Sequence, residues 1–183
     1  MRTLLPTTAA LLGLLACRDP AAGTFVGNPT MTARMAEPAE VGVVDGELIA
    51  LEMLLGDCDQ VGDVPLGSRT FTFDGAESRE ALQIPADEHC GVFLVVDLMR
   101  VVVDDGQGGE RELIADDFDL WVPTTFLARA NGRFRLRFGD DAWLSDVVAL
   151  TEPGTHSVNG EASLATAFFE GLDRSVVEEL APE

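Results

Sequence analysis

The residues of this chain best suited to chemistry are its two histidines and three cysteines. His89 and Cys90 are adjacent, as in a nucleophilic or metal-binding pair, but such a cysteine needs a thiolate and an activating partner. His156 lies in the turn-rich segment PGTHSVNG and has no partner nearby in sequence. The chain has no Gly-x-Ser-x-Gly, His-Glu-x-x-His, Cys-x-x-Cys or phosphate-binding glycine motif. We therefore assign no catalytic residue.

Clustered acidic residues raise the question of calcium. The stretch GDCDQVGD places three acids and a glycine in an EF-hand-like register: Asp57, Asp59, Asp63 and Gly62. Val61 and Ser68 stand where that loop needs a ligand and a bidentate acid, so the motif fails. DDGQGGE and FGDD are better interpreted as solvated loops. We expect no metal or cofactor, although a calcium-dependent adhesion module and a hydrolase with paired carboxylates stay open as alternatives.

The charge balance is strongly acidic. Twelve basic residues, all Arg, oppose 32 acidic ones, which gives a net charge of −20. A domain of this sign is repelled by nucleic acids and by anionic lipid surfaces. The acids are dispersed among apolar runs, and an apolar content of 46% argues against disorder. We therefore exclude nucleic-acid binding and expect a folded domain.

The N-terminal segment has the composition of a secretory leader. Arg2 is followed by a short apolar run that ends at Cys17, and this run is too short to span a bilayer. The sequence Leu14-Leu15-Ala16-Cys17 resembles the lipobox of bacterial lipoproteins. The resemblance implies that residues 1–16 are a signal peptide and that Cys17 carries a diacylglycerol and a further acyl chain. An ordinary leader cut elsewhere, or a buried helix with a chance cysteine, is the alternative.

The same resemblance sets the expected location. Two or three acyl chains give stable membrane anchoring, where one would not. Arg18, rather than Asp, follows the cysteine, which by analogy with enterobacterial sorting favours the outer membrane. Residues 17–29 are rich in small residues, Pro and Gly, and they are interpreted as the lipidated cysteine and a flexible tether.

Removal of the leader leaves Cys58 and Cys90 as the remaining pair of cysteines. In an exported chain, an even pair most simply forms a disulfide. In the chain-entropy model, closing this loop stabilises the fold by about 3 to 4 kcal/mol. We therefore predict a Cys58–Cys90 disulfide in preference to a reactive cysteine.

Residues 30–183 are expected to form one mainly β domain. Short apolar runs separated by turn signals predict an antiparallel β-sandwich of seven or eight strands. The expected strands are 31–36, 41–44, 47–55, 69–73, 91–103, 112–122, 124–130 and 133–138. The acidic domain is weakly similar to uncharacterised envelope lipoproteins with immunoglobulin-like or transthyretin-like sandwiches. That similarity rests on no diagnostic motif.

Two turns and a helical C-terminal region complete the expected fold. Asp45-Gly46 and Asn131-Gly132 are typical of type I′ turns. Helical spacing is expected at 141–150 and 160–181. A capping-box pattern at Ser175 and Glu178 would start the last helix. These helices are expected to cover the open end of the sandwich, or the last one to dock on a partner protein.

One basic island stands out, formed by Arg129, Arg133, Arg135 and Arg137. A two-residue turn at Asn131-Gly132 would pair Leu127 with Leu136 and place the alternate arginines on one face. Arg forks suit planar anions, so an anionic ligand or partner is one interpretation. The favoured alternative pairs the arginines with acids of the preceding strand: Glu112, Asp116, Asp117 and Asp119.

Together these features predict a lipid-anchored, non-catalytic module of the cell envelope. The anchor and tether would hold it at a membrane, and the absence of catalytic motifs favours binding over reaction. The expected partner is an envelope protein or a glycan.

Overall fold

The computed structural model describes residues 27–38, 40–58, 63–106 and 109–181. The predicted leader and residues 17–26 of the predicted lipidated cysteine and tether lie outside the described residues, as do Asp59 and Gly62 of the candidate calcium loop. In chain order the elements are β1 (Thr30–Met35), β2 (Gly42–Asp57), β3 (Val64–Asp74), β4 (Glu77–Gln83), β5 (Glu88–Asp104), β6 (Glu110–Val122), β7 (Phe126–Leu127), β8 (Arg133–Phe138), α1 (Trp143–Val148), β9 (Gly154–Ser157), a 3₁₀ turn (Val158–Gly160), α2 (Ala162–Leu172) and β10 (Val176–Leu180).

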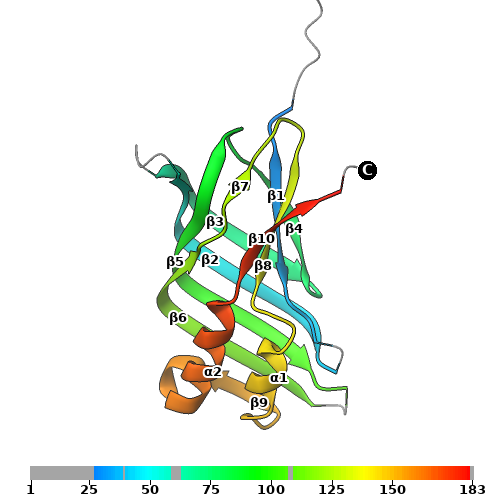
Figure 1. The fold of residues 1–183 in the computed structure, drawn as a ribbon. Helices are drawn as coiled ribbons and strands as arrows, with labels where there is room; N and C mark the ends of the chain where they lie inside the picture. Colours follow the sequence, from blue (N-terminus) through cyan, green and yellow to red (C-terminus); the bar gives the residue numbers. More distant parts are fainter. Residues whose placement is uncertain (1–26, 39, 59–62, 107–108, 182–183) are drawn as a thin grey trace, which may run out of the picture.

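The strands form one curled sheet in the order β10-β8-β1-β4-β3-β2-β5-β6-β9, and β7 pairs with β5 (Figure 1). Most neighbours are antiparallel, but β1 pairs with β8 and β6 with β9 in parallel. The fold is therefore mainly β, as predicted, but the sheet is mixed rather than purely antiparallel. Parallel pairs need long connections, and both pairs join strands far apart in sequence.

Strand β2 is longer than predicted, because the chain runs straight through Asp45-Gly46. The predicted turn at this dipeptide is therefore wrong. A Cβ at Gly46 would lie 2.8 Å from Met35 Cε and 2.9 Å from the backbone oxygen of Arg100. The glycine serves the close approach of neighbouring elements, which is a common reason for glycine within a strand.

The chain does turn at Asn131, with φ of 59°, but no hairpin follows. Strand β8 pairs with β1 and β10, whereas Phe126 and Leu127 pair with β5. The predicted pairing of Leu127 with Leu136 is therefore wrong, and the Leu127 side chain is 46% exposed. Asn131 instead exchanges hydrogen bonds with Gly27: its Oδ1 accepts at 2.8 Å, and its backbone N–H donates at 2.9 Å. Strand β1, which begins three residues after Gly27, pairs along one edge of β8, and β10 pairs along the other.

The C-terminal region is only partly helical. Helices α1 and α2 fall within the predicted 141–150 and 160–181 segments, but the last part of the second segment is strand β10. The predicted helix start at Ser175 is wrong, because the Ser175 hydroxyl donates back to the Leu172 carbonyl and accepts from Gly139 N–H at 3.0 Å. The β-branched pair Val176-Val177 then continues along β8.

Both helices pack at one end of the sheet, away from the end at which β1 begins (Figure 1). Trp143 of α1 is fully buried and meets Phe168 of α2 edge-to-face, with ring centroids 5.3 Å apart. The inner faces of the strands and these two helices share one apolar core. None of the helices in the described part of the chain is long and apolar enough to cross a membrane.

Candidate binding surface

The predicted disulfide is present and joins the end of β2 to the start of β5. Cys58 and Cys90 are bonded, with their Cα atoms 5.0 Å apart. Cys90 therefore offers no thiolate to its neighbour His89. The His89 ring is buried against Phe126, and its Nε2 lies 3.2 Å from the Pro85 carbonyl oxygen. The His89-Cys90 pair is a structural part of the strand end.

Three of the predicted arginines do share a face of β8, because Phe134, Leu136 and Phe138 occupy the alternate, buried positions. Their partners differ from the predicted ones. Arg135 Nη2 lies 3.4 Å from Glu77 of β4, and Arg137 Nε lies 3.0 Å from Glu178 of β10. The predicted acids on β6 are not involved in these pairs, because β6 is not a neighbour of β8 in the sheet.

The other two residues of the basic island are Arg133 and Arg129. Arg133 stands on the same face of β8, and Arg129 is an exposed residue of the loop before the strand. Arg137 gains a second partner in Asp141, at 3.2 Å. Ion pairs within the protein therefore explain the presence of Arg135 and Arg137 on this face. Binding of an anion by the basic island stays a prediction.

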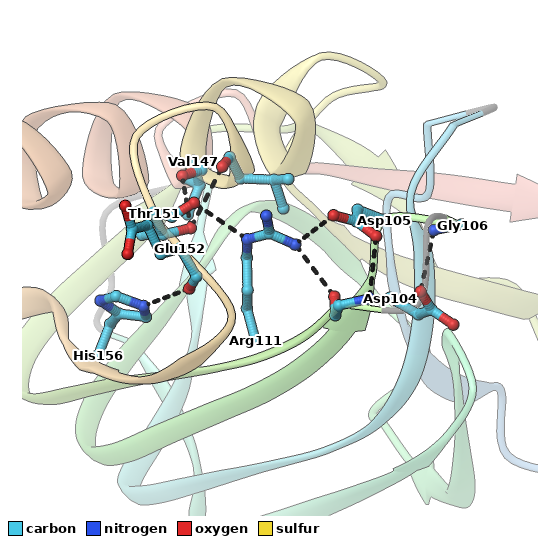
Figure 2. Close-up of polar contacts among 10 residues, drawn as sticks. Asp104, Asp105, Gly106, Arg111, Val147, Thr151, Glu152 and His156 are labelled. Atoms are coloured by element: carbon cyan, nitrogen blue, oxygen red, sulfur yellow. Dashed lines mark hydrogen bonds and ion pairs between the residues drawn. The ribbon is translucent and has the colours of Figure 1, made fainter.

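A buried guanidinium, that of Arg111, ties the β5–β6 turn to the segment after α1 (Figure 2). Its Nη1 donates to Asp105 Oδ2 at 2.7 Å and to the Gly109 carbonyl at 3.0 Å, and its Nε donates to the Thr151 carbonyl at 3.2 Å. A concavity of about 390 Å³ lies beside this group. Because its donors are used to join two loops, we interpret Arg111 as a structural residue.

Arg100 and Glu112 form a second ion pair, on the solvent side of β5 and β6. Arg100 Nε donates to Glu112 Oε1 at 2.6 Å, Arg100 Nη1 donates to Asp45 at 3.2 Å, and the Thr155 hydroxyl donates to Glu112 Oε2 at 2.9 Å. The hydrogen bond from Arg100, followed by that from Thr155, lowers the pKa of Glu112 below its ordinary value. The hydrogen bond to Glu112 likewise raises the pKa of Arg100.

Replacing Glu112 with Gln is expected to flatten the acid side of the stability–pH curve. Because folding lowers the pKa of Glu112, its carboxylate contributes stability that is fully present above the ordinary value of 4.5 and is lost as the pH falls through the folded-state pKa. At about pH 7 the wild type should therefore have a higher free energy of unfolding than Glu112→Gln, and urea titrations should show this difference shrinking toward about pH 3. Glu110→Gln, a control on the same strand, should leave the wild-type pH dependence in place.

The most distinctive surface feature is a row of apolar side chains across the solvent-facing side of four strands. Leu54 lies opposite Pro65 of β3 and Phe93 of β5, and Phe93 lies opposite Trp121 of β6. The flanking residues of each strand point inward to the core, whereas these four are outside it. We call this set the outer row: Pro65, Leu54, Phe93 and Trp121.

Trp121 is held in place by two glycines. A Cβ at Gly91 would lie 2.5 Å from Trp121 Cη2, and a Cβ at Gly56 would lie 2.9 Å from the same atom. The indole therefore lies directly over the backbones of β5 and β2, next to the disulfide that joins these strand ends. It is nevertheless 45% exposed. A large aromatic group that is both fixed and accessible is typical of a binding hot spot.

Neither histidine belongs to a candidate metal-binding cluster among the described residues. His156 Nε2 lies 2.7 Å from the Glu152 carbonyl oxygen, and Nδ1 lies 3.8 Å from Glu161 Oε1. Within residues 27–181, excluding the gaps, no group of three or more His, Cys, Asp or Glu side chains is placed to hold a metal ion. The ring nitrogens of His89 and His156 that have partners contact groups of the protein itself.

The sequence interpretation missed the outer row, although two signals pointed to it. In β6, Trp121 has the same phase as the exposed acid Asp119, so it falls on the polar side of the alternation. Gly56 and Gly91 interrupt two strands, and glycine within a strand often marks a close approach of another group. Only the strand register shows that these features meet. No protein family, curated protein or solved structure matches this chain.

Proposed function

We propose that this chain is a lipid-anchored, non-catalytic lipoprotein of the cell envelope, in the outer membrane, that binds an envelope partner through the outer row. The observation that carries the proposal is Trp121, an indole fixed over two glycines yet open to solvent. Contiguous exposed apolar groups on a soluble domain are typical of interaction sites. Arg111 and His89 Nε2 make contacts within the protein, and Cys90 is held in the disulfide.

A sandwich of the immunoglobulin-like or transthyretin-like kind is part of the same proposal. It is supported by the narrow junction between β3 and β4, where only two residue pairs are in register. The strands on either side of this junction form two groups: β10-β8-β1-β4 and β3-β2-β5-β6-β9.

Cys17→Ser is expected to move the protein from the membrane fraction to the soluble envelope fraction. The change removes the sulfur to which the predicted diacylglycerol is attached, and the remaining chain carries no other predicted lipid site. Fractionation of a bacterial host that expresses the full chain, with mass spectrometry of the mature N-terminus, measures the outcome. Membrane retention of an unacylated Cys17→Ser protein would refute the anchor.

The binding surface is tested by co-purification from envelope extracts with matched variants. Trp121→Ser is expected to abolish recovery of a partner that the wild type retains, because the indole is the centre of the proposed contact. Leu150→Ser removes a side chain of similar exposure, 49%, outside the outer row and should leave recovery unchanged. Equal recovery by both variants and the wild type would dismiss the outer row as the contact surface.

A further inference from the structure

The outer row continues into a surface with a regular charge pattern. Two positions along β5 from Phe93, Val95 lies between Glu52 of β2 and Asp119 of β6. Beyond a bulge, Leu98 lies between Ile49 and Asp116. The solvent side of β5 therefore carries an apolar stripe of Phe93, Val95 and Leu98, which the exposed bulge residue Asp97 interrupts. Both neighbouring strands carry acids beside this stripe.

This face carries a single basic residue against these acids, and it lies opposite Glu47. Arg100 is the one basic residue on the solvent side of the described parts of β2, β5 and β6, and it is already paired with Glu112 and Asp45. Further carboxylates on these strands have no ion pair to a described residue, including the exposed Asp97 on β5 and Asp117 on β6. We call four others the acidic rails: Glu47 and Glu52 on β2, and Asp116 and Asp119 on β6.

We propose that this face binds a cationic amphipathic helix of a partner protein, which lies along β5 with its apolar side on the stripe. This inference rests on the proposed function as a binding module and names the chemistry of the partner. The rails stand one strand to either side of β5, so they are separated by about 9.5 Å. That spacing is close to the diameter of an α-helix with side chains, about 10 to 12 Å.

The charge pattern of this face also disfavours binding of a second copy of the chain. A second copy of this chain would bring its own acidic rails against these, and like charges across an interface are unfavourable. A cationic helix would instead pair lysines or arginines on its two flanks with both rails. Apolar residues at helical spacing would contact Phe93, Val95 and Leu98, and Trp121 would close one end.

The test uses the full chain as Cys17→Ser and two synthetic helical peptides of about 18 residues, long enough to exceed the stripe. One peptide carries leucines on one side and lysines elsewhere, and the other has glutamates in place of the lysines. Titration calorimetry should detect binding of the lysine peptide only. Trp121→Ser and Phe93→Ser should each weaken binding by about tenfold or more, since central aromatic contacts dominate interfaces. Leu150→Ser should have no effect.

Because a chain of net charge −20 attracts any cation, the rails need a matched control. Glu52→Gln, Asp116→Asn and Asp119→Asn together should weaken binding about tenfold at low salt, and this difference should shrink in about 0.5 M salt. The control neutralises three exposed acids elsewhere: Asp146→Asn, Glu152→Gln and Asp173→Asn. An equal loss in both triple variants would overturn the proposal, because attraction would then be non-specific.

Two further outcomes separate this inference from the proposed function. Self-association that Trp121→Ser abolishes, measured by sedimentation, would assign the face to a second copy. Binding of neutral oligosaccharides, with no binding of the lysine peptide, would assign it to a glycan. Either result would refute binding of a cationic helix but would leave the outer row as a binding surface. The outer row itself is refuted only if Trp121→Ser leaves the co-purification of a partner unaffected.

Discussion

Removing the disulfide by Cys58→Ser with Cys90→Ser is expected to lower the free energy of unfolding by about 3 to 4 kcal/mol. The bond closes a loop with a sequence separation of 32, which contains β3 and β4. Without it, the unfolded chain gains the freedom that this loop closure removes. Urea unfolding under oxidising conditions measures the loss.

The same double variant is expected to loosen the strand ends on which Trp121 packs. The bond lies beside Gly56 and Gly91, which support the indole, so the strand ends should separate more readily without it. Quenching of tryptophan fluorescence by acrylamide under native conditions should increase. Wild-type protein in reductant should behave like the double variant, and Cys17→Ser should not. If reductant leaves the urea midpoint unchanged, the bond contributes no stability.

Trp143→Ala is expected to destabilise the fold by about 3 to 5 kcal/mol, the range for large aromatic residues removed from a core. The Trp143 side chain is 0% exposed and contacts the Phe168 ring. It also lies close to Gly139 and Gly171, at both of which a Cβ would overlap the indole. A cavity at this point would loosen both helices from the end of the sheet. Thermal and urea unfolding measure the change.

The chain supplies its own control in the second tryptophan. Trp121→Ala makes the same chemical change on the solvent side of β6, where it should cost about 1 kcal/mol or less. Trp143→Phe should cost less than Trp143→Ala, because it keeps most of the ring contact and removes an indole N–H that has no hydrogen-bond partner among the described residues. Equal losses from both alanine variants would contradict the assignment of Trp143 to the core and Trp121 to the surface.

The sequence anticipated features that depend on local pattern. Strands with clear alternation, such as β8, were placed correctly, because their buried phase reads directly from Phe134, Leu136 and Phe138. The Cys58–Cys90 bond followed from counting cysteines. The turn predicted at Asp45-Gly46 and the helix start predicted at Ser175 are wrong, and the turn at Asn131 forms without the predicted hairpin, because non-local pairing decided the structure at each of them.

Pairing between strands far apart in sequence is also the reason why the candidate site could not be predicted from the sequence. The partners of Arg135 and Arg137 come from β4, β10 and Asp141 rather than from β6, which no local pattern predicts. The outer row takes one residue from each of four strands, so each member alone is an unremarkable apolar residue. Trp121 becomes a candidate hot spot only when Gly56 and Gly91 lie beneath it.

By itself, the sequence determined the charge of this protein, its mainly β character, its disulfide and the prediction of a lipid anchor at Cys17. These properties depend on residue type and on short-range periodicity, which a linear chain already contains. The tertiary structure alone decided which strands are neighbours, and therefore which acids pair with the arginines and which apolar groups share the outer face. Strand register joins residues far apart in sequence, and a change of one residue in register would turn Trp121 toward the opposite face.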